Sequence, residues 1–186
     1  MERALKLPGP DNTDLVALRS DDAPALYAAI SEHRAALDPW LRWSAAITSE
    51  SEAEAFIEGF IRRERLDEGF HLGLWDADAL CGGVVCWSID PAHHVAELGY
   101  WLTPDSRRRG LARRATQRVV DYLFGRGVNR IEFQCRVENA PSRRVAEGVG
   151  GILEGVRRQS HLVGGSFRDH AVYAVLRSDR VDTRDA

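Results

Sequence analysis

Several residue types and segments are scarce in this sequence, and each scarcity excludes a class of protein. The three cysteines, Cys81, Cys86 and Cys135, show neither a CxxC pair nor Cys/His metal spacing, which argues against a disulfide-stapled secreted fold and against a zinc site. No apolar run is long enough for a membrane span, and residues 1–14 lack the basic-then-apolar order of a signal peptide. We therefore expect a soluble, cytoplasmic protein that binds no metal and no membrane.

The charge and the length of the chain further limit its possible partners and its number of domains. Lys6 is the only lysine among 25 basic residues, and the formal net charge at pH 7 is −3, which argues against nucleic acid as a partner. With 186 residues, 44% of them hydrophobic, the chain can bury a full core. The length predicts a single domain over residues 1–186, with its core at 14–177 and a polar tail at 178–186.

Residues 95–126 carry the most informative pattern in the chain. An apolar run at 95–102 leads through a turn at 103–106 and three arginines to Gly110, after which apolar residues recur at helical spacing. This order predicts a strand, a loop and a helix. Because a helix N-terminus presents unpaired N–H groups and the positive end of the helix dipole, we expect it to bind an anionic group such as a phosphate.

The remaining patterns predict a mixed, mostly antiparallel sheet with helices on both faces. Capping residues and apolar stripes mark helices at 24–37, from 49 onward, from 111 onward and at 139–149. Apolar or alternating segments mark strands at 15–18, 70–75, 80–89, 93–102, 128–137, 152–163 and 167–177. The order β-α-α-β-β-β-α-β-α-β-β predicts a three-layer α+β fold with about seven strands. Residues 1–13 are expected to be a flexible or edge-lying lead-in.

The sequence resembles the GNAT superfamily of acyl-CoA-dependent N-acetyltransferases. The pyrophosphate loop of that family follows the pattern Gln/Arg-x-x-Gly-x-Gly/Ala, which Arg107-Arg108-Arg109-Gly110-Leu111-Ala112 matches, and Asn139-x-x-Ser142 follows the next predicted strand. Segments 39–43, 96–102, 135–142 and 152–155 are similar to the RimL-type ribosomal-protein N-terminal acetyltransferases and their RimJ relatives. The resemblance implies the GNAT fold and acetyl-CoA as cosubstrate. Related proteins often dimerise, so a homodimer is also an option.

The resemblance assigns acetyl-CoA to two stretches. The backbone amides of 108–112 can cradle the pyrophosphate because Gly110 permits close approach, whereas the backbone of 100–102 would bind the pantetheine arm and supply an N–H to the oxyanion. The cofactor-binding residues so predicted are Tyr100, Trp101, Leu102, Arg107, Arg108, Arg109, Gly110, Leu111, Ala112, Arg113, Asn139 and Ser142. For each arginine side chain the alternative is a solvated helix face.

Asn139 and Ser142 have both a functional and a structural interpretation. By resemblance, Asn139 contacts the pantetheine arm, and Ser142 donates a hydrogen bond or a proton to the departing thiolate. Residues of these types at a helix start are also what N-terminal capping alone would select. The match to the family motif favours the functional interpretation.

The catalytic base is open at this stage. RimL-type sequences carry a glutamate where His161 stands here, and a neutral histidine can also accept a proton near pH 7. Glu97 is the other candidate, because a carboxylate within an apolar strand should have a raised pKa. Its alternatives are a hydrogen bond to the neighbouring strand or contact with the acceptor. A water relay without a dedicated base is the third possibility.

Two further features concern the acceptor and the chemistry. Trp40 and Trp43 either fill the space beneath the loop at 38–43 or form a wall of the acceptor groove. Cys135 aligns with a cysteine that lies near the coenzyme A thiol in this branch, but no residue in the sequence would activate it as a nucleophile. We therefore expect direct attack of the amine through a tetrahedral intermediate.

The sequence thus leaves three functions open. The first is acetylation of the N-terminal α-amine of a protein, with a ribosomal protein as the acceptor. The second is acetylation of a small amine such as an amino acid, a polyamine or an antibiotic. The third is a non-catalytic acyl-CoA-binding protein, to which only His161 in place of the family's glutamate points.

Overall fold

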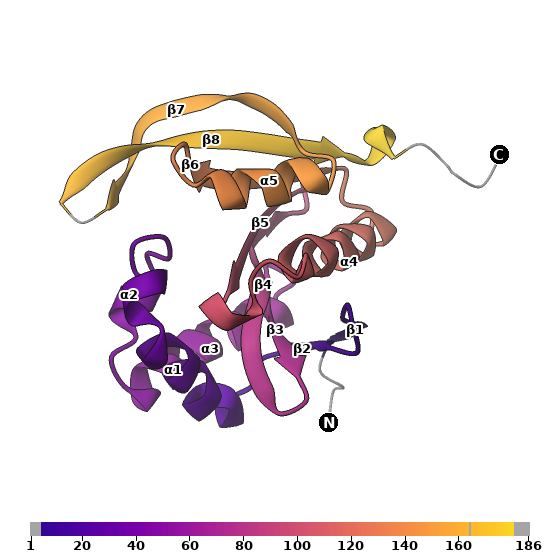
Figure 1. Ribbon diagram of the computed structural model, residues 1–186. Helices are drawn as coiled ribbons and strands as arrows, with labels where there is room; N and C mark the ends of the chain where they lie inside the picture. Colours follow the sequence, from indigo (N-terminus) through magenta and orange to yellow (C-terminus); the bar gives the residue numbers. More distant parts are fainter. Residues whose placement is uncertain (1–4, 164, 181–186) are drawn as a thin grey trace.

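An eight-stranded mixed sheet forms the centre of the computed structural model, which describes residues 5–163 and 165–180 (Figure 1). The strands lie in the order β1-β2-β3-β4-β5-β6-β8-β7. Their bounds are β1 Lys6–Pro8, β2 Asp14–Ala17, β3 Phe70–Asp76, β4 Ala79–Asp90, β5 Val95–Leu102, β6 Arg130–Arg136, β7 Ile152–Val163 and β8 Ser166–Leu176. Neighbouring strands are antiparallel except β5 and β6, which are parallel because a helix connects them.

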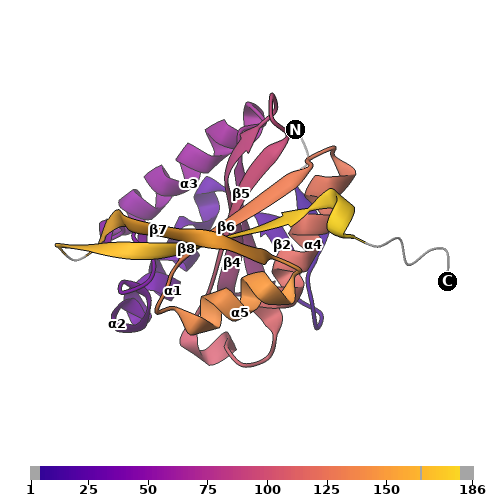
Figure 2. The ribbon, with the colours of Figure 1, turned by 90° about the horizontal axis from the view of Figure 1, so that it is seen from above.

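Helices cover both faces of the sheet, as the sequence predicts (Figures 1 and 2). They are α1 Ala23–Glu32, α2 Arg34–Leu37, α3 Glu50–Arg65, α4 Leu111–Gly125 and α5 Ala140–Gly148. Buried side chains of α1 and α3 pack with Leu80, Val85 and Trp101 in one core cluster, whereas those of α4 and α5 pack in the other. The predicted three-layer α+β class is confirmed. None of the helices in the described residues combines the length and the apolar character that a membrane span needs.

Local sequence signals account for where these helices begin. Ser49 caps α3, because its hydroxyl accepts a hydrogen bond from the Glu52 N–H at 3.2 Å. The Glu52 carboxylate in turn accepts from the Thr48 N–H at 2.6 Å, one residue earlier than the usual capping box. The apolar stripe of α4, from Leu111 to Leu123, is fully buried, which agrees with its helical spacing in the sequence.

The fold differs from the prediction in two details. The segment Lys6–Pro8 is an additional edge strand that pairs with β2, so the sheet has eight strands where about seven were expected. The predicted helix at 24–37 is divided at His33, whose φ of −117° and ψ of 17° interrupt the helical geometry between α1 and α2. The lead-in is thus edge-lying from residue 6. Residues 1–4, Gly164 and 181–186, including most of the predicted tail, are outside the described residues.

Gly83 tests how closely β4 packs against its neighbours. A Cβ at this position would lie 2.7 Å from the Leu72 carbonyl oxygen and 2.9 Å from Trp101 Nε1, so Gly83→Ala should lower the free energy of unfolding by about 1–3 kcal/mol. The control is Gly125→Ala at the end of α4, where a Cβ meets nothing within 4 Å and stability should stay equal or rise by up to about 1 kcal/mol. Urea unfolding measures both, and an unchanged midpoint for Gly83→Ala would contradict this account of the packing.

Candidate active site

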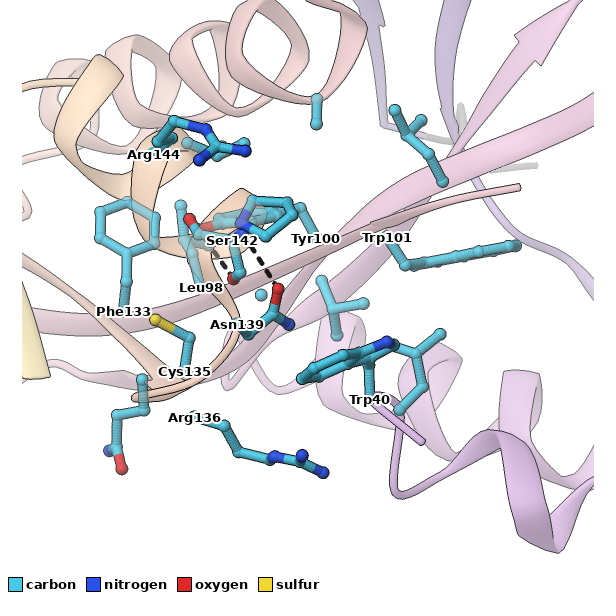
Figure 3. Close-up of a pocket in the computed structure, with 18 of the residues that line it drawn as sticks. Trp40, Leu98, Tyr100, Trp101, Phe133, Cys135, Arg136, Asn139, Ser142 and Arg144 are labelled. Atoms are coloured by element: carbon cyan, nitrogen blue, oxygen red, sulfur yellow. Dashed lines mark hydrogen bonds between the residues drawn. The ribbon is translucent and has the colours of Figure 1, made fainter. Parts of the chain in front are cut away.

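A cleft of about 1110 Å³ lies where β5 and β6 separate (Figure 3). The two strands are paired only along Val95–Leu98 of β5 and 130–133 of β6. β5 nevertheless continues to Leu102 against β4, and β6 continues to Arg136 against β8. The two strand ends therefore diverge, and their unpaired edges form opposite walls of the cleft.

The open edge of β5 presents backbone donors to the cleft. The Thr103 N–H donates to the carbonyl oxygen of Cys81 in β4 at 3.0 Å, and successive N–H groups of a strand point to alternate sides. The N–H of Trp101 therefore points toward β4, whereas those of Tyr100 and Leu102 point toward the side that β6 has left. Of the three predicted residues, Tyr100 and Leu102 are thus the ones whose N–H groups can stabilise a developing oxyanion.

The loop before α4 forms the anion-binding end of the cleft. Gly110 precedes the helix with a φ of 69°, and no side chain caps the helix start. The N–H groups of Leu111 and Ala112 are in the first turn, where a helix offers them no partner, and both residues line the cleft. Arg108 also has a positive φ, 65°, a conformation that costs a non-glycine residue about 1–2 kcal/mol. The loop geometry, the free N–H groups and the helix dipole together suit a phosphate.

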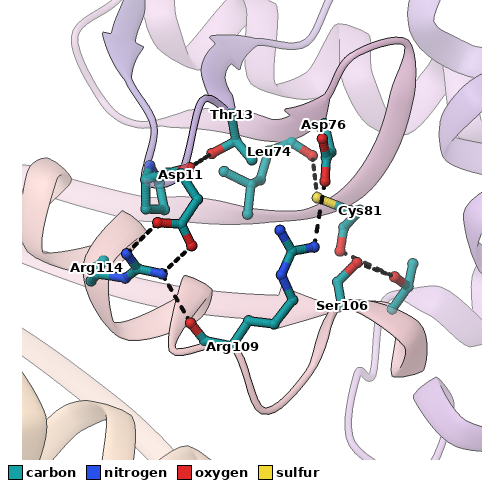
Figure 4. A network of polar contacts seen from close by, with 10 residues as sticks. Asp11, Thr13, Leu74, Asp76, Cys81, Ser106, Arg109 and Arg114 are labelled. Atoms are coloured by element: carbon teal, nitrogen blue, oxygen red, sulfur yellow. Dashed lines mark hydrogen bonds and ion pairs between the residues drawn. The ribbon is translucent and has the colours of Figure 1, made fainter.

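The arginines around this loop divide into two groups. Arg107, Arg108 and Arg113 line the cleft. Arg109 instead points to Asp76, with its Nη1 3.4 Å from the carboxylate, and Arg114 donates to Asp11 at 2.6 Å (Figure 4). Of the predicted site residues, Arg109 is therefore the one whose side chain the structure does not bring into the cleft wall. The backbone carbonyl oxygen of Arg109 accepts a hydrogen bond from the Arg114 guanidinium at 2.9 Å.

The start of α5 provides the hydroxyl groups of the cleft (Figure 3). The Asn139 side chain caps this helix by accepting from the Ser142 N–H at 3.2 Å. The Tyr100 hydroxyl donates to the Ser142 carbonyl oxygen at 2.6 Å, and the Ser142 hydroxyl donates to the Tyr100 oxygen at 3.3 Å. Through the first of these hydrogen bonds, Tyr100 on β5 holds Ser142 in place across the gap between the divided strands. The Ser142 hydroxyl makes the longer of the two hydrogen bonds, so its proton can turn toward a ligand more easily than that of Tyr100.

Cys135 lies beside Ser142 in the same wall. Its thiol is buried, and burial raises its pKa, while the Ser142 hydroxyl opposes that shift. A raised pKa keeps the thiol protonated, and a protonated thiol is a poor nucleophile. The structure therefore gives no support to covalent transfer through Cys135.

Tryptophans form the wall at the opposite end, between the loop after α2 and the β7–β8 hairpin. Trp43 stacks on Phe56, with ring centroids 4.8 Å apart, and fills the interior. Trp40 is 41% exposed, and the Arg136 guanidinium lies 4.5 Å above its ring. Both tryptophans line the cleft. The packing interpretation thus fits Trp43, and the groove-wall interpretation fits Trp40; we refer to this part of the cleft as the acceptor end.

The candidate bases also lie in the cleft wall. Glu97 is on β5, directly opposite Glu132 of β6; burial raises the pKa of its carboxyl, and the charge of Glu132 raises it further. His161 on β7 lines the cleft as well. Its ring centroid is 3.9 Å from that of His170 on β8. His170 also lines the cleft, so the structure brings together a histidine pair where the sequence suggested one histidine.

Two residues of the cleft wall, Arg144 and His170, are not among the site residues predicted from the sequence. Arg144 lies on α5 and adds another arginine to the cleft wall, opposite those around the loop before α4. The position of Arg144, two residues after Ser142 near a helix start, is a signal for a phosphate ligand of the same kind as the arginines before α4. His170 had no comparable signal, because its position depends on how β7 and β8 pair.

The cleft fits a long ligand with phosphates at one end and a carbonyl group at the other. Guanidinium groups and helix N–H groups occupy the phosphate end, and the open β5 edge leads from there to Ser142. Gly110 presents no side chain to a ligand at the loop; the nearest atom to a Cβ built there is Arg114 Nε on α4, at 3.8 Å. Coenzyme A thioesters have these features, and the residues present suit them.

Comparison with known proteins assigns the family. Residues 13–152 match the acetyltransferase (GNAT) domain family. The chain is 26% identical over 165 residues to the ribosomal-protein-serine acetyltransferase of Escherichia coli strain K12, a match that covers 88% of this chain and 92% of that protein. It is also similar to a solved structure of RimL, a ribosomal L7/L12 α-N-protein acetyltransferase, with coenzyme A linked to a cysteine by a disulfide. That match has a TM-score of 0.89 and 25% identity and covers 92% of this chain and 98% of the other.

A second solved structure shares the fold. The microcin C7 self-immunity acetyltransferase MccE, in complex with acetyl-CoA and AMP, aligns with a TM-score of 0.85 and 24% identity, over 89% of this chain and 93% of that chain. The family match contains the whole phosphate loop, the divided strands and Ser142. The chain therefore belongs to the GNAT family and is an acetyl-CoA-dependent N-acetyltransferase.

Proposed function

We propose that this N-acetyltransferase acetylates the α-amine of a protein N-terminus and that its acceptor is a ribosomal protein. Two relatives support the acceptor class, since one is a ribosomal-protein-serine acetyltransferase and the other acts on the α-amine of ribosomal L7/L12 by its name. The observation that carries the proposal is the charge of the cleft wall.

The cleft is basic along its whole length. Glu97 is the single acidic residue among the described residues of its wall, against six arginines. Arg42, Arg136 and the histidines belong to the acceptor end. Polyamines and aminoglycosides carry several positive charges, which such a wall repels. A peptide N-terminus brings one positive charge, together with backbone carbonyl groups that can accept hydrogen bonds from arginine.

The proposed chemistry uses both walls of the cleft. The amine attacks the thioester carbonyl, and the N–H of Tyr100 or Leu102 stabilises the oxyanion that develops. The Ser142 hydroxyl donates a hydrogen bond or its proton to the departing thiolate. Glu97 or a histidine of the His161–His170 pair, directly or through water, takes the proton that the amine loses. Arg107, Arg108, Arg113 and the first-turn N–H groups hold the phosphates of acetyl-CoA, with Asn139 beside the pantetheine arm.

The non-catalytic alternative has less support than catalysis. The argument for it is that His161 stands in place of the family's glutamate. In the structure, however, the ring centroid of His170 lies 3.9 Å from that of His161. A proton acceptor is therefore available even without a carboxylate at that position. A small amine that carries negative charge, such as an amino acid, stays the alternative substrate.

Three further sequence-based predictions stay part of the proposal. The cytoplasmic location follows if the acceptor is a ribosomal protein. The single domain is supported by one continuous sheet. The homodimer is supported by β7, an edge strand whose Ile152 and Val156 are 62% and 48% exposed, because exposed edge strands with apolar side chains favour association.

An acceptor panel tests the proposed substrate class. We expect acetylation of peptides that begin with Ser or Ala, and little or none of spermidine or an aminoglycoside, because the cleft wall repels polycations. Release of free thiol from acetyl-CoA measures turnover, and mass spectrometry locates the acetyl group. Raising the salt concentration should partly restore polyamine turnover if charge is the cause. Efficient acetylation of spermidine at low salt would contradict the proposal.

Arg113 tests the phosphate end of the cleft. Arg113→Ala should weaken coenzyme A binding roughly threefold to tenfold, as expected for one charge-assisted hydrogen bond. Arg118→Ala is the matched control, because Arg118 is exposed on the same helix and is not part of the cleft wall. Isothermal titration calorimetry measures both affinities. Equal affinities for the two variants would show that Arg113 makes no contact with the ligand.

Ser142 tests the role of the hydroxyl near the departing thiolate. Ser142→Ala should lower kcat by roughly tenfold to a hundredfold while leaving the affinity for coenzyme A nearly unchanged. Helix α5 should keep its cap, because Asn139 accepts from the backbone N–H of residue 142 and not from the side chain. Steady-state kinetics and calorimetry separate the two effects. A kcat equal to that of the wild type would remove Ser142 from the mechanism.

A further inference from the structure

The β7–β8 hairpin contains an irregular pairing beside the acceptor end. Arg157 pairs with His170, and His161 pairs with Arg168, so four residue steps along β7 match two along β8. The two extra residues bulge out, and Gln159 among them has a φ of 50°. The Gln159 N–H donates to the Asp169 carboxylate at 2.8 Å, which fixes the bulge. Bulges of this kind often redirect a side chain next to an active site, and this one brings His161 onto His170.

The hydrogen bonds of His170 determine which of its nitrogens carries the proton. His170 Nδ1 lies 3.3 Å from the Arg168 carbonyl oxygen. A carbonyl oxygen can only accept, so Nδ1 must be the donor, and the neutral ring keeps its lone pair on Nε2. The same Nδ1 lies 3.4 Å from Ser160 Oγ, which can accept part of this hydrogen bond. Among the described residues, His170 Nε2 has no hydrogen-bond partner, and the ring lines the cleft.

Ser160 lies within hydrogen-bond distance of both rings and so links the tautomer of His161 to that of His170. Ser160 Oγ lies 3.0 Å from His161 Nδ1. Because the lone pairs of Ser160 face the His170 N–H, its hydroxyl proton is free to donate to His161 Nδ1. A neutral His161 then carries its own proton on Nε2. The two rings therefore present opposite groups: His170 an acceptor, and His161 a donor.

On the basis of the proposed α-amine acceptor, we propose that His170, and not His161, accepts the proton of the acceptor ammonium, directly or through one water. In this scheme Ser160 is a positioning residue that sets the two tautomers. His161 Nε2–H donates a hydrogen bond to the acceptor, for example to a backbone carbonyl oxygen of the peptide.

The proton balance is complete with these groups. The ammonium gives one proton to His170 Nε2, and the lone pair that this frees forms the C–N bond with the thioester carbon. When the C–S bond breaks, the second proton of the nitrogen passes to the sulfur, with Ser142 bridging the transfer. His170 returns its proton to solvent after the product leaves.

Burial, together with the charges around the pair, favours the neutral form of both rings. Burial lowers the pKa of each histidine, and each is lowered further by nearby cations. The charged and titratable groups that face them are Arg42 of the loop after α2, Arg136 and Glu138 at the end of β6, Arg157 of β7, and the other histidine. The hydrogen bond to the Arg168 carbonyl and the charge of Glu138 raise the pKa of His170 and oppose part of this shift. A free base is thus available over the physiological range.

Nitrogen NMR of the histidine rings tests the tautomers without any catalysis. We expect the neutral His170 ring to carry its proton on Nδ1 and the His161 ring to carry it on Nε2. Ser160→Ala should remove the preference of His161 but not that of His170, because the Arg168 carbonyl stays in place. The opposite tautomers in the wild-type protein would overturn the assignment, even if no acceptor were ever acetylated.

Kinetics measured from acidic to neutral pH test the role of the proton acceptor. Since the base must be unprotonated and the pKa of His170 is lowered, kcat/KM of the wild type should rise with pH on the acidic side of neutrality; His170→Asn should lower kcat at least a hundredfold and remove that rise. His161→Asn should mainly raise KM and keep the rise. Glu97→Gln should keep it too, and His94→Asn, at an exposed turn on the opposite end of β5, is the control.

The outcomes separate this inference from the proposed function. A pH profile lost in His161→Asn or Glu97→Gln but kept in His170→Asn would refute His170 as the proton acceptor. A wild-type protein that acetylates no peptide but acetylates a small amine would refute the proposed acceptor alone, because the same variants can then be compared on that amine.

Discussion

The separation of β5 from β6 is the constraint on which the site depends. A paired β6 would use the outward N–H groups of Tyr100 and Leu102 in the sheet, and no donor would be left for an oxyanion. Separation alone would leave the two walls free to move relative to each other. The Tyr100 hydroxyl prevents this, because its 2.6 Å hydrogen bond to the Ser142 carbonyl oxygen joins the β5 wall to α5. This hydrogen bond holds the unpaired N–H groups of Tyr100 and Leu102 and the Ser142 hydroxyl in one geometry.

The arrangement of charge explains how an acidic protein can have a basic cleft. The formal net charge is −3, yet acidic side chains are nearly absent from the cleft wall. Asp11 and Asp76 instead hold Arg114 and Arg109 on the outer side of the phosphate loop. Such exposed ion pairs add little to stability. They hold Arg109 and Arg114 away from the cleft, whereas the cleft-lining Arg107, Arg108 and Arg113 form no ion pair with a carboxylate among the described residues.

The sequence predicted the acetyl-CoA half of the site better than the acceptor half, and the reason is physical. The phosphate loop and the cap of α5 depend on contacts between residues a few positions apart, so a local pattern such as Arg107–Ala112 or Asn139–Ser142 shows them. The side-chain direction of Arg109 depends on Asp76, which is distant in the sequence. His170 depends on a bulge that changes strand register, and a shift of register cannot be derived from periodicity alone. The additional edge strand Lys6–Pro8 was too short to show alternation.

The two halves of the site also differ in how freely they can vary, and this affects which acceptors one family can use. The family match ends at residue 152, where β7 begins, so the hairpin that carries His161 and His170 lies outside it. A bulge can enlarge, shrink or disappear without disturbing the β5–β6 separation, because β7 is the edge strand of the sheet. The acetyl-CoA half, by contrast, is enclosed by β4, α4 and α5. Variation in the hairpin can therefore alter the acceptor and the identity of the base while the chemistry at the thioester stays the same.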